Sequence, residues 1–236
     1  MNLPNMLTAS RIVAAPVVAW LPFIATWQAR LGAFVLFVAI AITDYYDGKL
    51  ARESNQVTDL GKLLDPLADK LLVVATFVPM FVLVGSGSSL SLISPFETSP
   101  AVCTWCPDSP SRFPYLTPFA VFGLPWWILA IVLGREIAMT VFRQYAKRRG
   151  VLIEAIGPAK WKTGLQLTWV GASLFWFAVA TASLEYRWST PMWGAAANFV
   201  GLVSVLAMIG AVGLTLWSLW LYARQNRRLI AGIASA

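Results

Sequence analysis

The chain has 236 residues, of which 58% are hydrophobic and only 12% are charged, and its formal net charge is +7. Soluble domains carry about 25% charged residues, so this composition excludes an ordinary soluble domain and predicts an integral membrane protein. In such a chain the positive charge indicates contact with anionic membrane lipids and anionic substrates, and not with nucleic acid.

Six apolar runs, each near the roughly 20 residues that cross a bilayer, predict an all-α bundle of about six transmembrane helices. The expected spans are 12–27, 31–51, 63–84, 121–145, 164–183 and 192–222. The first run is short, which indicates an irregular or interfacial entry at 4–10, and the last is long enough to tilt or project from the bilayer. No separate soluble domain is indicated, so residues 1–236 form one membrane domain.

A segment rich in serine and proline separates the third and fourth runs at about 85–124, and it contains Cys103 and Cys106. On the outer side of a membrane these thiols could form a strained local disulfide. Two thiols without a histidine or a nearby acidic cluster make a poor zinc site. We therefore expect a structural or incidental role for them.

The basic residues orient the bundle. All but three of the 18 lysines and arginines fall on one side of the six-span arrangement, and the exceptions are Arg30, Arg112 and Arg187. Cytoplasmic loops carry the excess of lysine and arginine in membrane proteins. Both termini are therefore predicted at the cytoplasmic face, together with the connection between the second and third spans.

That connection holds four aspartates, in the segment DYYDGKLARESNQVTDLGKLLDPLADK. Asp44 and Asp47 are three residues apart near the end of one expected helix, and Asp65 and Asp69 are four apart near the start of the next, so each pair shares one helix face. If the helices pack antiparallel, the four carboxylates converge and repel each other unless hard cations lie between them. Two Mg²⁺ ions, with Mn²⁺ as the alternative, would balance the charges and could clamp a phosphoryl group.

Proton transfer also points to these aspartates. The chain has no histidine, which removes the commonest general base, and its two cysteines lie on the other side of the membrane. An aspartate is therefore the expected base.

The acidic segment resembles the signature of the CDP-alcohol phosphatidyltransferase family, D-x-x-D-G-x-x-A-R followed after eight residues by G-x-x-x-D-x-x-x-D. Every fixed position is present, at Asp44, Asp47, Gly48, Ala51, Arg52, Gly61, Asp65 and Asp69. The motif covers only residues 44–69, but the six-span layout and the cytoplasmic placement also fit this family, whose members are usually homodimers.

The resemblance implies a role for each aspartate. Asp44, Asp47 and Asp65 would hold one metal ion. Asp44, Asp65 and Asp69 would hold the second, and Asp69 would also remove the proton from the attacking hydroxyl.

The resemblance also implies which residues bind the donor, CDP-diacylglycerol. Gly48, Arg52 and Thr58 would contact its CDP moiety, since glycine allows close backbone approach and arginine can fork onto a diphosphate and stabilise the departing CMP. Asn5, Thr8 and Arg11 would lie over the CDP group. The alternatives are helix packing for Gly48, a helix cap for Thr58 and a membrane anchor for Arg11.

Looser similarities, LPNMLTASRI, LDPLADKLL, GREI and PAKWKT, resemble the bacterial phosphatidylglycerophosphate synthase branch of the family. That branch lies in the bacterial cytoplasmic membrane, transfers the phosphatidyl group of CDP-diacylglycerol to the 1-hydroxyl of glycerol 3-phosphate and releases CMP. The long outer segment departs from the compact pattern of the branch.

An acceptor that already carries a phosphate needs positive charge beside the metal site. Arg135 and Arg143 are eight residues apart, about two helical turns on one face, and Lys160 and Lys162 follow at the same membrane surface. We expect these four residues to bind the acceptor phosphate. The alternative is that they are ordinary basic residues at cytoplasmic helix ends.

Three other functions compete. A relative that uses inositol phosphate, or a cardiolipin-type enzyme that uses phosphatidylglycerol, would keep the same acids. A divalent-cation transporter would place its acids near the membrane midplane, whereas here they lie beside Lys49, Arg52 and Lys62 at one face. A structural scaffold would not explain four acids at these intervals.

Overall fold

A computed structural model describes residues 3–54, 59–84, 91–92, 113–148, 158–188 and 190–225. For 3–8, 45–54, 59–67, 69, 91–92, 120–121, 143, 147–148 and 158–160 the description is limited to the backbone. The helices are α1 (Leu3–Trp20), a short 3-10 turn η1 (Leu21–Phe23), α2 (Trp27–Ser54), α3 (Asp59–Val84), α4 (Trp126–Arg148), α5 (Pro158–Glu185) and α6 (Pro191–Gln225). The strands are β1 (Ser91–Leu92), β2 (Tyr115–Leu116) and β3 (Ala120–Phe122).

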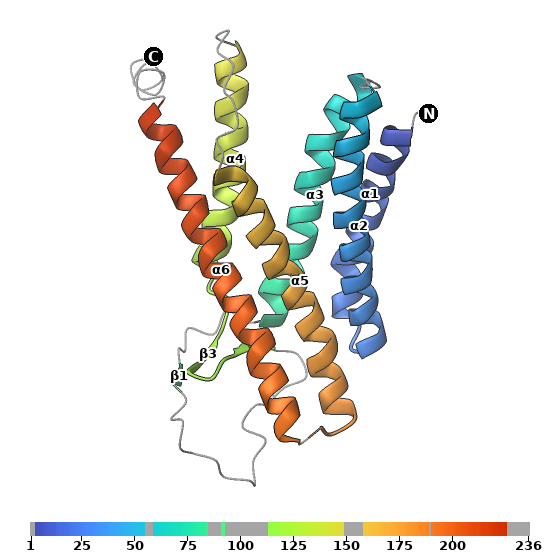
Figure 1. Ribbon diagram of the computed structural model, residues 1–236, viewed down its shortest axis with the longest axis vertical. Coiled ribbons are helices and arrows are strands. Elements are labelled where there is room, and N and C mark those ends of the chain that lie inside the picture. Colours follow the sequence, from blue (N-terminus) through green and yellow to red (C-terminus); the bar gives the residue numbers. More distant parts are fainter. Residues whose placement is uncertain are drawn as a thin grey trace.

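The helices form one bundle in which α5 is central (Figure 1). Helix α5 packs against α2, α3 and α6, while α1 contacts both α2 and α3, and α4 contacts α3 and α6. The start of α1, the end of α2, the start of α3 and the ends of α4 and α6 lie at the same end of the bundle (Figure 1). The predicted all-α fold with about six helices is therefore confirmed, and the start of α1 and the end of α6 share one end of the bundle, as expected.

Length and composition identify a membrane protein. Within the described ranges, three segments are long and apolar enough to cross a bilayer: Trp27–Asp44, Trp161–Glu185 and Pro191–Gln225. Two further apolar segments are shorter, Ala9–Phe23 and Lys70–Val84. Helix α6 has 35 residues, about 52 Å at 1.5 Å per residue against a hydrocarbon core of about 30 Å, so it must tilt or project as predicted.

The predicted span boundaries need three corrections. The entry at 4–10 is regular helix, because α1 already begins at Leu3. Trp27 begins α2 instead of ending the first span, because the chain bends between η1 and α2. Val121 lies in β3, paired with Ser91 and Leu116, so the fourth helix begins only at Trp126.

A small antiparallel sheet in the order β1, β3, β2 lies at the end of the bundle opposite the start of α1 and the end of α6 (Figure 1). It belongs to the segment expected to be an outer loop, of which Cys103 and Cys106 lie outside the described residues. The backbone N–H of Phe113 donates to the carbonyl oxygen of Leu83 at 2.6 Å, which ties the sheet to the end of α3.

Polar groups of the core fasten this sheet to α5. The hydroxyl of Tyr115, which is fully buried, lies 2.7 Å from Oγ of Ser173 and accepts a hydrogen bond of 3.1 Å from Nε1 of Trp169. Trp169 is also fully buried and packs edge-on against Phe77 of α3, with ring centroids 5.1 Å apart. Buried polar groups need such partners, so this cluster fixes how β2 lies on the helices.

Arg30 is a second link at this end. Only 3% exposed, it donates through Nε to the carbonyl oxygen of Pro22 at 3.0 Å and through Nη1 to Oγ1 of Thr181. Its guanidinium also lies 4.6 Å from the ring centroid of Phe113. The arginine thus joins η1, α5 and the start of the sheet segment.

Strand β2 packs directly on α6 at Gly201. A Cβ atom at this glycine would lie 1.6 Å from the carbonyl oxygen and 2.8 Å from the backbone nitrogen of Leu116. Backbone cannot retreat as a flexible side chain can, so a residue without a side chain is required here.

We predict that Gly201→Ala destabilises the folded protein by about 1–3 kcal/mol, as overpacking of a filled core does. Gly213→Ala is the matched control, because a Cβ at Gly213 on the same helix would meet nothing within 4 Å. Thermal unfolding in detergent should show a lower midpoint for the first variant alone. Equal midpoints would contradict the close packing of β2 on α6.

Candidate functional site

A cavity of about 220 Å³ lies between the first five helices. Its polar lining comprises Arg11 of α1, Asp44 of α2, Thr76 of α3, Glu136 of α4, and Lys162, Thr163 and Gln166 of α5. Apolar residues, among them Phe37, Leu72 and Val170, complete the walls. A signature aspartate and a predicted phosphate ligand thus line the same cavity.

Asp44 is held by an arginine from the neighbouring helix. Nη1 of Arg11 forms an ion pair with Oδ1 of Asp44. The side chain of Arg11 is only 6% exposed, whereas that of Asp44 is 54% exposed. The pair therefore fixes the carboxylate from its buried side and leaves Asp44 facing the cavity.

Glu136 and Lys162 of the cavity lining belong, with Arg135, to a three-residue charge cluster that we call the α4–α5 cluster. Arg135 donates from Nη1 to Oε1 of Glu136 at 3.0 Å, and Lys162 donates from Nζ to the same oxygen. The second terminal nitrogen of Arg135 donates to Oγ of Ser218 at 3.2 Å. The cluster thereby connects α4, α5 and α6.

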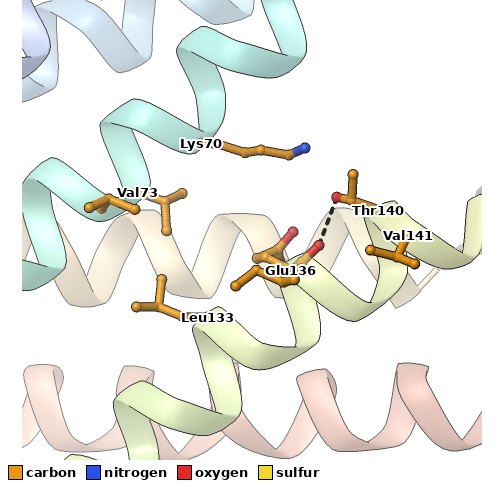
Figure 2. A pocket seen from close by; sticks show the side chains of 8 residues that line it. Lys70, Val73, Leu133, Glu136, Thr140 and Val141 are labelled. Carbon is orange, nitrogen blue, oxygen red and sulfur yellow. Dashed lines mark hydrogen bonds between the residues drawn. The ribbon is translucent and has the colours of Figure 1, made fainter. Parts of the chain in front are cut away.

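Glu136 also borders a second, more apolar cavity of about 360 Å³ between α3 and α4 (Figure 2). Lys70 and Val73 of α3 face Leu133, Glu136 and Val141 of α4 across it (Figure 2). Val73 and Glu136 line both cavities. The two cavities therefore share a wall.

The remaining signature residues lie on the expected helices. Asp47, Gly48 and Arg52 belong to α2, and Gly61, Asp65 and Asp69 belong to α3. The two helices run antiparallel, and the residues left between them are 55–58 (Figure 1). The side chains of Asp47, Asp65 and Asp69 lie outside the described part, so the described side chains do not include a group of three metal-binding residues.

The other predicted ligands divide in the same way. Arg11, Arg135 and Lys162 have described side chains and lie at or beside the polar cavity. Asn5 and Thr8 lie on α1, Arg143 on α4 and Lys160 on α5, each with the backbone alone described. Thr58 lies outside the described residues.

Glu136 is the site residue that the sequence analysis missed. The GREI segment served as one of the similarities to the synthase branch, and its arginine as an expected phosphate ligand, but its glutamate was given no role. An acid within an otherwise apolar span was the available signal, since such residues are costly unless they are paired or functional.

Comparison with known proteins gives a consistent result. A family model described as CDP-alcohol phosphatidyltransferase matches residues 1–217. An Arabidopsis thaliana protein named CDP-diacylglycerol–glycerol-3-phosphate 3-phosphatidyltransferase 1 is 31% identical over 232 residues, which are 95% of this chain. A Rickettsia bellii protein with the same activity in its name is 53% identical over 72 residues, 30% of this chain and 40% of its own length.

A rice protein named cardiolipin synthase (CMP-forming) is also similar, with 28% identity over 98% of this chain. The chain spans 62% of the length of the Arabidopsis protein and 59% of the rice protein. The names of the Arabidopsis and Rickettsia proteins specify CDP-diacylglycerol and glycerol 3-phosphate, whereas the name of the rice protein specifies cardiolipin synthesis with formation of CMP.

We predict that Asp44→Asn lowers the free energy of unfolding by about 1 kcal/mol, a modest value because the Asp44 side chain is half exposed. The loss arises because the guanidinium of Arg11 is buried and loses this carboxylate. In an Arg11→Met background the same substitution should cost less, since the pair is already broken. Unfolding in detergent with a chelator present measures the free energy of unfolding of each variant. If Asp44→Asn lowered this free energy equally in the wild type and in the Arg11→Met background, the coupling between the two residues would be refuted.

Proposed function

The chain belongs to the CDP-alcohol phosphatidyltransferase family, and from that premise we propose that it is a phosphatidylglycerophosphate synthase. It would transfer the phosphatidyl group of CDP-diacylglycerol to the 1-hydroxyl of glycerol 3-phosphate and release CMP. The names of the Arabidopsis and Rickettsia relatives support this acceptor.

One observation carries the proposal: Asp44 and Lys162 line the same cavity. A carboxylate of the signature in this lining suits the metal-bound diphosphate of the donor. A lysine in the same lining, with Arg135 linked to it through Glu136, suits an acceptor that brings its own phosphate. An uncharged acceptor would have no use for these cations.

Family members generally depend on a divalent metal, and the donor set fits Mg²⁺, because Asp44 presents a partly exposed carboxylate to the cavity and magnesium prefers carboxylate oxygens. We propose that Asp44, Asp47, Asp65 and Asp69 hold two ions. When bound, the ions would neutralise the diphosphate and stabilise the charge of the leaving CMP.

The protein's own groups would do the rest. Asp69 takes the proton from the 1-hydroxyl of glycerol 3-phosphate, and that oxygen attacks the phosphorus bearing diacylglycerol. The bond from this phosphorus to the oxygen of CMP breaks, and Arg52 stabilises the departing phosphate. Arg135 and Lys162, with Arg143 and Lys160, hold the acceptor phosphate and so align the attacking oxygen.

We further propose a location in a bacterial cytoplasmic membrane, with both termini and the site on the cytoplasmic side. The support is the basic excess at the end of the bundle where the start of α1, the end of α6 and the facing ends of α2 and α3 lie (Figure 1). We also propose a homodimer, which light scattering of the protein in detergent would test.

The activity is tested by supplying the purified protein with CDP-diacylglycerol, MgCl₂ and one acceptor at a time. The acceptors are glycerol 3-phosphate, inositol 1-phosphate and phosphatidylglycerol, and the lipid product is identified by mass spectrometry. We expect phosphatidylglycerophosphate. Cardiolipin as the main product would instead favour the activity named for the rice relative.

We predict that Asp69→Asn abolishes CMP release while the protein still folds, because the amide cannot accept the proton of the attacking hydroxyl. The assay is release of labelled CMP in the presence of glycerol 3-phosphate and Mg²⁺. Glu185→Gln, at the far end of α5, serves as a control for loss of an acid elsewhere. Turnover at the wild-type rate by the Asp69 variant would remove this residue from the role of base.

A further inference from the structure

We propose that Glu136 is a positioning residue for the acceptor: its carboxylate holds Lys162 and Arg135 in the orientation in which they receive the acceptor phosphate. The proposal rests on the function proposed above. It gives a role to a residue that lies outside the signature motif and carries the charge opposite to that expected of a phosphate site.

The carboxylate of Glu136 joins two cations. A single oxygen, Oε1, accepts from Nζ of Lys162 and from Nη1 of Arg135 at 3.0 Å. These cations come from different helices, α5 and α4, and without an anion between them they would repel each other. The carboxylate therefore determines where both cations lie.

The two cations are more deeply buried than the carboxylate that joins them. Lys162 and Arg135 are 4% and 8% exposed, whereas the side chain of Glu136 is 31% exposed. Two buried cations without an anion would carry a large desolvation cost. Glu136 thus offsets the desolvation cost of burying Lys162 and Arg135 in an apolar bundle before the acceptor binds.

Lys162 is placed to bind a phosphate in the polar cavity while it stays bonded to Glu136. Glu136 and Lys162 line the polar cavity together with Asp44, and Arg135, which donates to the same carboxylate, also donates to Ser218 of α6. An ammonium group has three donors, so Lys162 can donate to Glu136 and to a phosphate at once. Lysine has a long flexible side chain, and a fixed hydrogen bond removes much of the freedom it would otherwise lose on binding.

The test compares steady-state kinetics of the wild type, Glu136→Gln and Glu136→Asp, with each substrate varied in turn. For Glu136→Gln we expect the KM for glycerol 3-phosphate to rise by about tenfold, the effect of losing one charge-assisted hydrogen bond, with the KM for CDP-diacylglycerol unchanged. Glu136→Asp keeps the charge on a shorter side chain and should give an intermediate KM. Glu185→Gln is the control and should leave both constants unchanged.

A double-mutant cycle tests whether Glu136 acts through Lys162. In a Lys162→Met background, Glu136→Gln should raise the acceptor KM by a smaller factor than in the wild type, because one of the two positioned cations is already gone. Independent, multiplicative effects would overturn the proposal. So would a lower acceptor KM in Glu136→Gln, which would mean that the carboxylate only repels the phosphate.

Other outcomes remain decisive. A fall in kcat with both KM values unchanged, or a Glu136→Gln protein that does not fold, would assign Glu136 a structural role and overturn the proposal. If the wild type uses another acceptor, the proposed function fails, and the same measurements are made with that acceptor. If the wild type uses glycerol 3-phosphate and the Glu136 variants keep its KM, only the positioning role fails.

Discussion

Charged side chains inside an apolar bundle are stable only when other protein groups compensate them, and this constraint organises the whole molecule. Arg11 pairs with Asp44, the α4–α5 cluster pairs two cations with Glu136, and Arg30 is satisfied by Pro22, Thr181 and Phe113. Each of these groups joins separate helices. In lipid, apolar contact between helices is weakly specific, because the lipid tails are as apolar as the side chains. Polar contacts such as these therefore specify which helices pack together.

The same constraint explains why much of the fold and site could be predicted from the sequence. The apolar runs that bury backbone in lipid are long and contiguous, so six helices followed from composition. The spacing of Asp44 and Asp47, and of Asp65 and Asp69, placed each pair on one helix. Because few residues separate the two helices, they were expected to run antiparallel. These signals are local, and the structure has the helices where they indicated.

The missed features depend on contacts between distant segments. Glu136 follows a predicted ligand directly in sequence, yet its significance comes from Lys162, 26 residues later on another helix. Val121 belongs to a run that is apolar enough for a helix, but pairing with Ser91 and Leu116 makes it a strand. Neither local propensity nor periodicity contains such partners, so only the folded chain reveals them.

The sheet gives the bundle one fastened end. Strand β2 lies on α6 at Gly201, Phe113 is bonded to the end of α3, and β3 leads within a few residues into α4. Three helices are thus anchored together at the end opposite the start of α1 and the end of α6. If the helices separate to admit a lipid, they would pivot about this anchored end. The opening would then be widest at the opposite end of the bundle, where the charged groups lie.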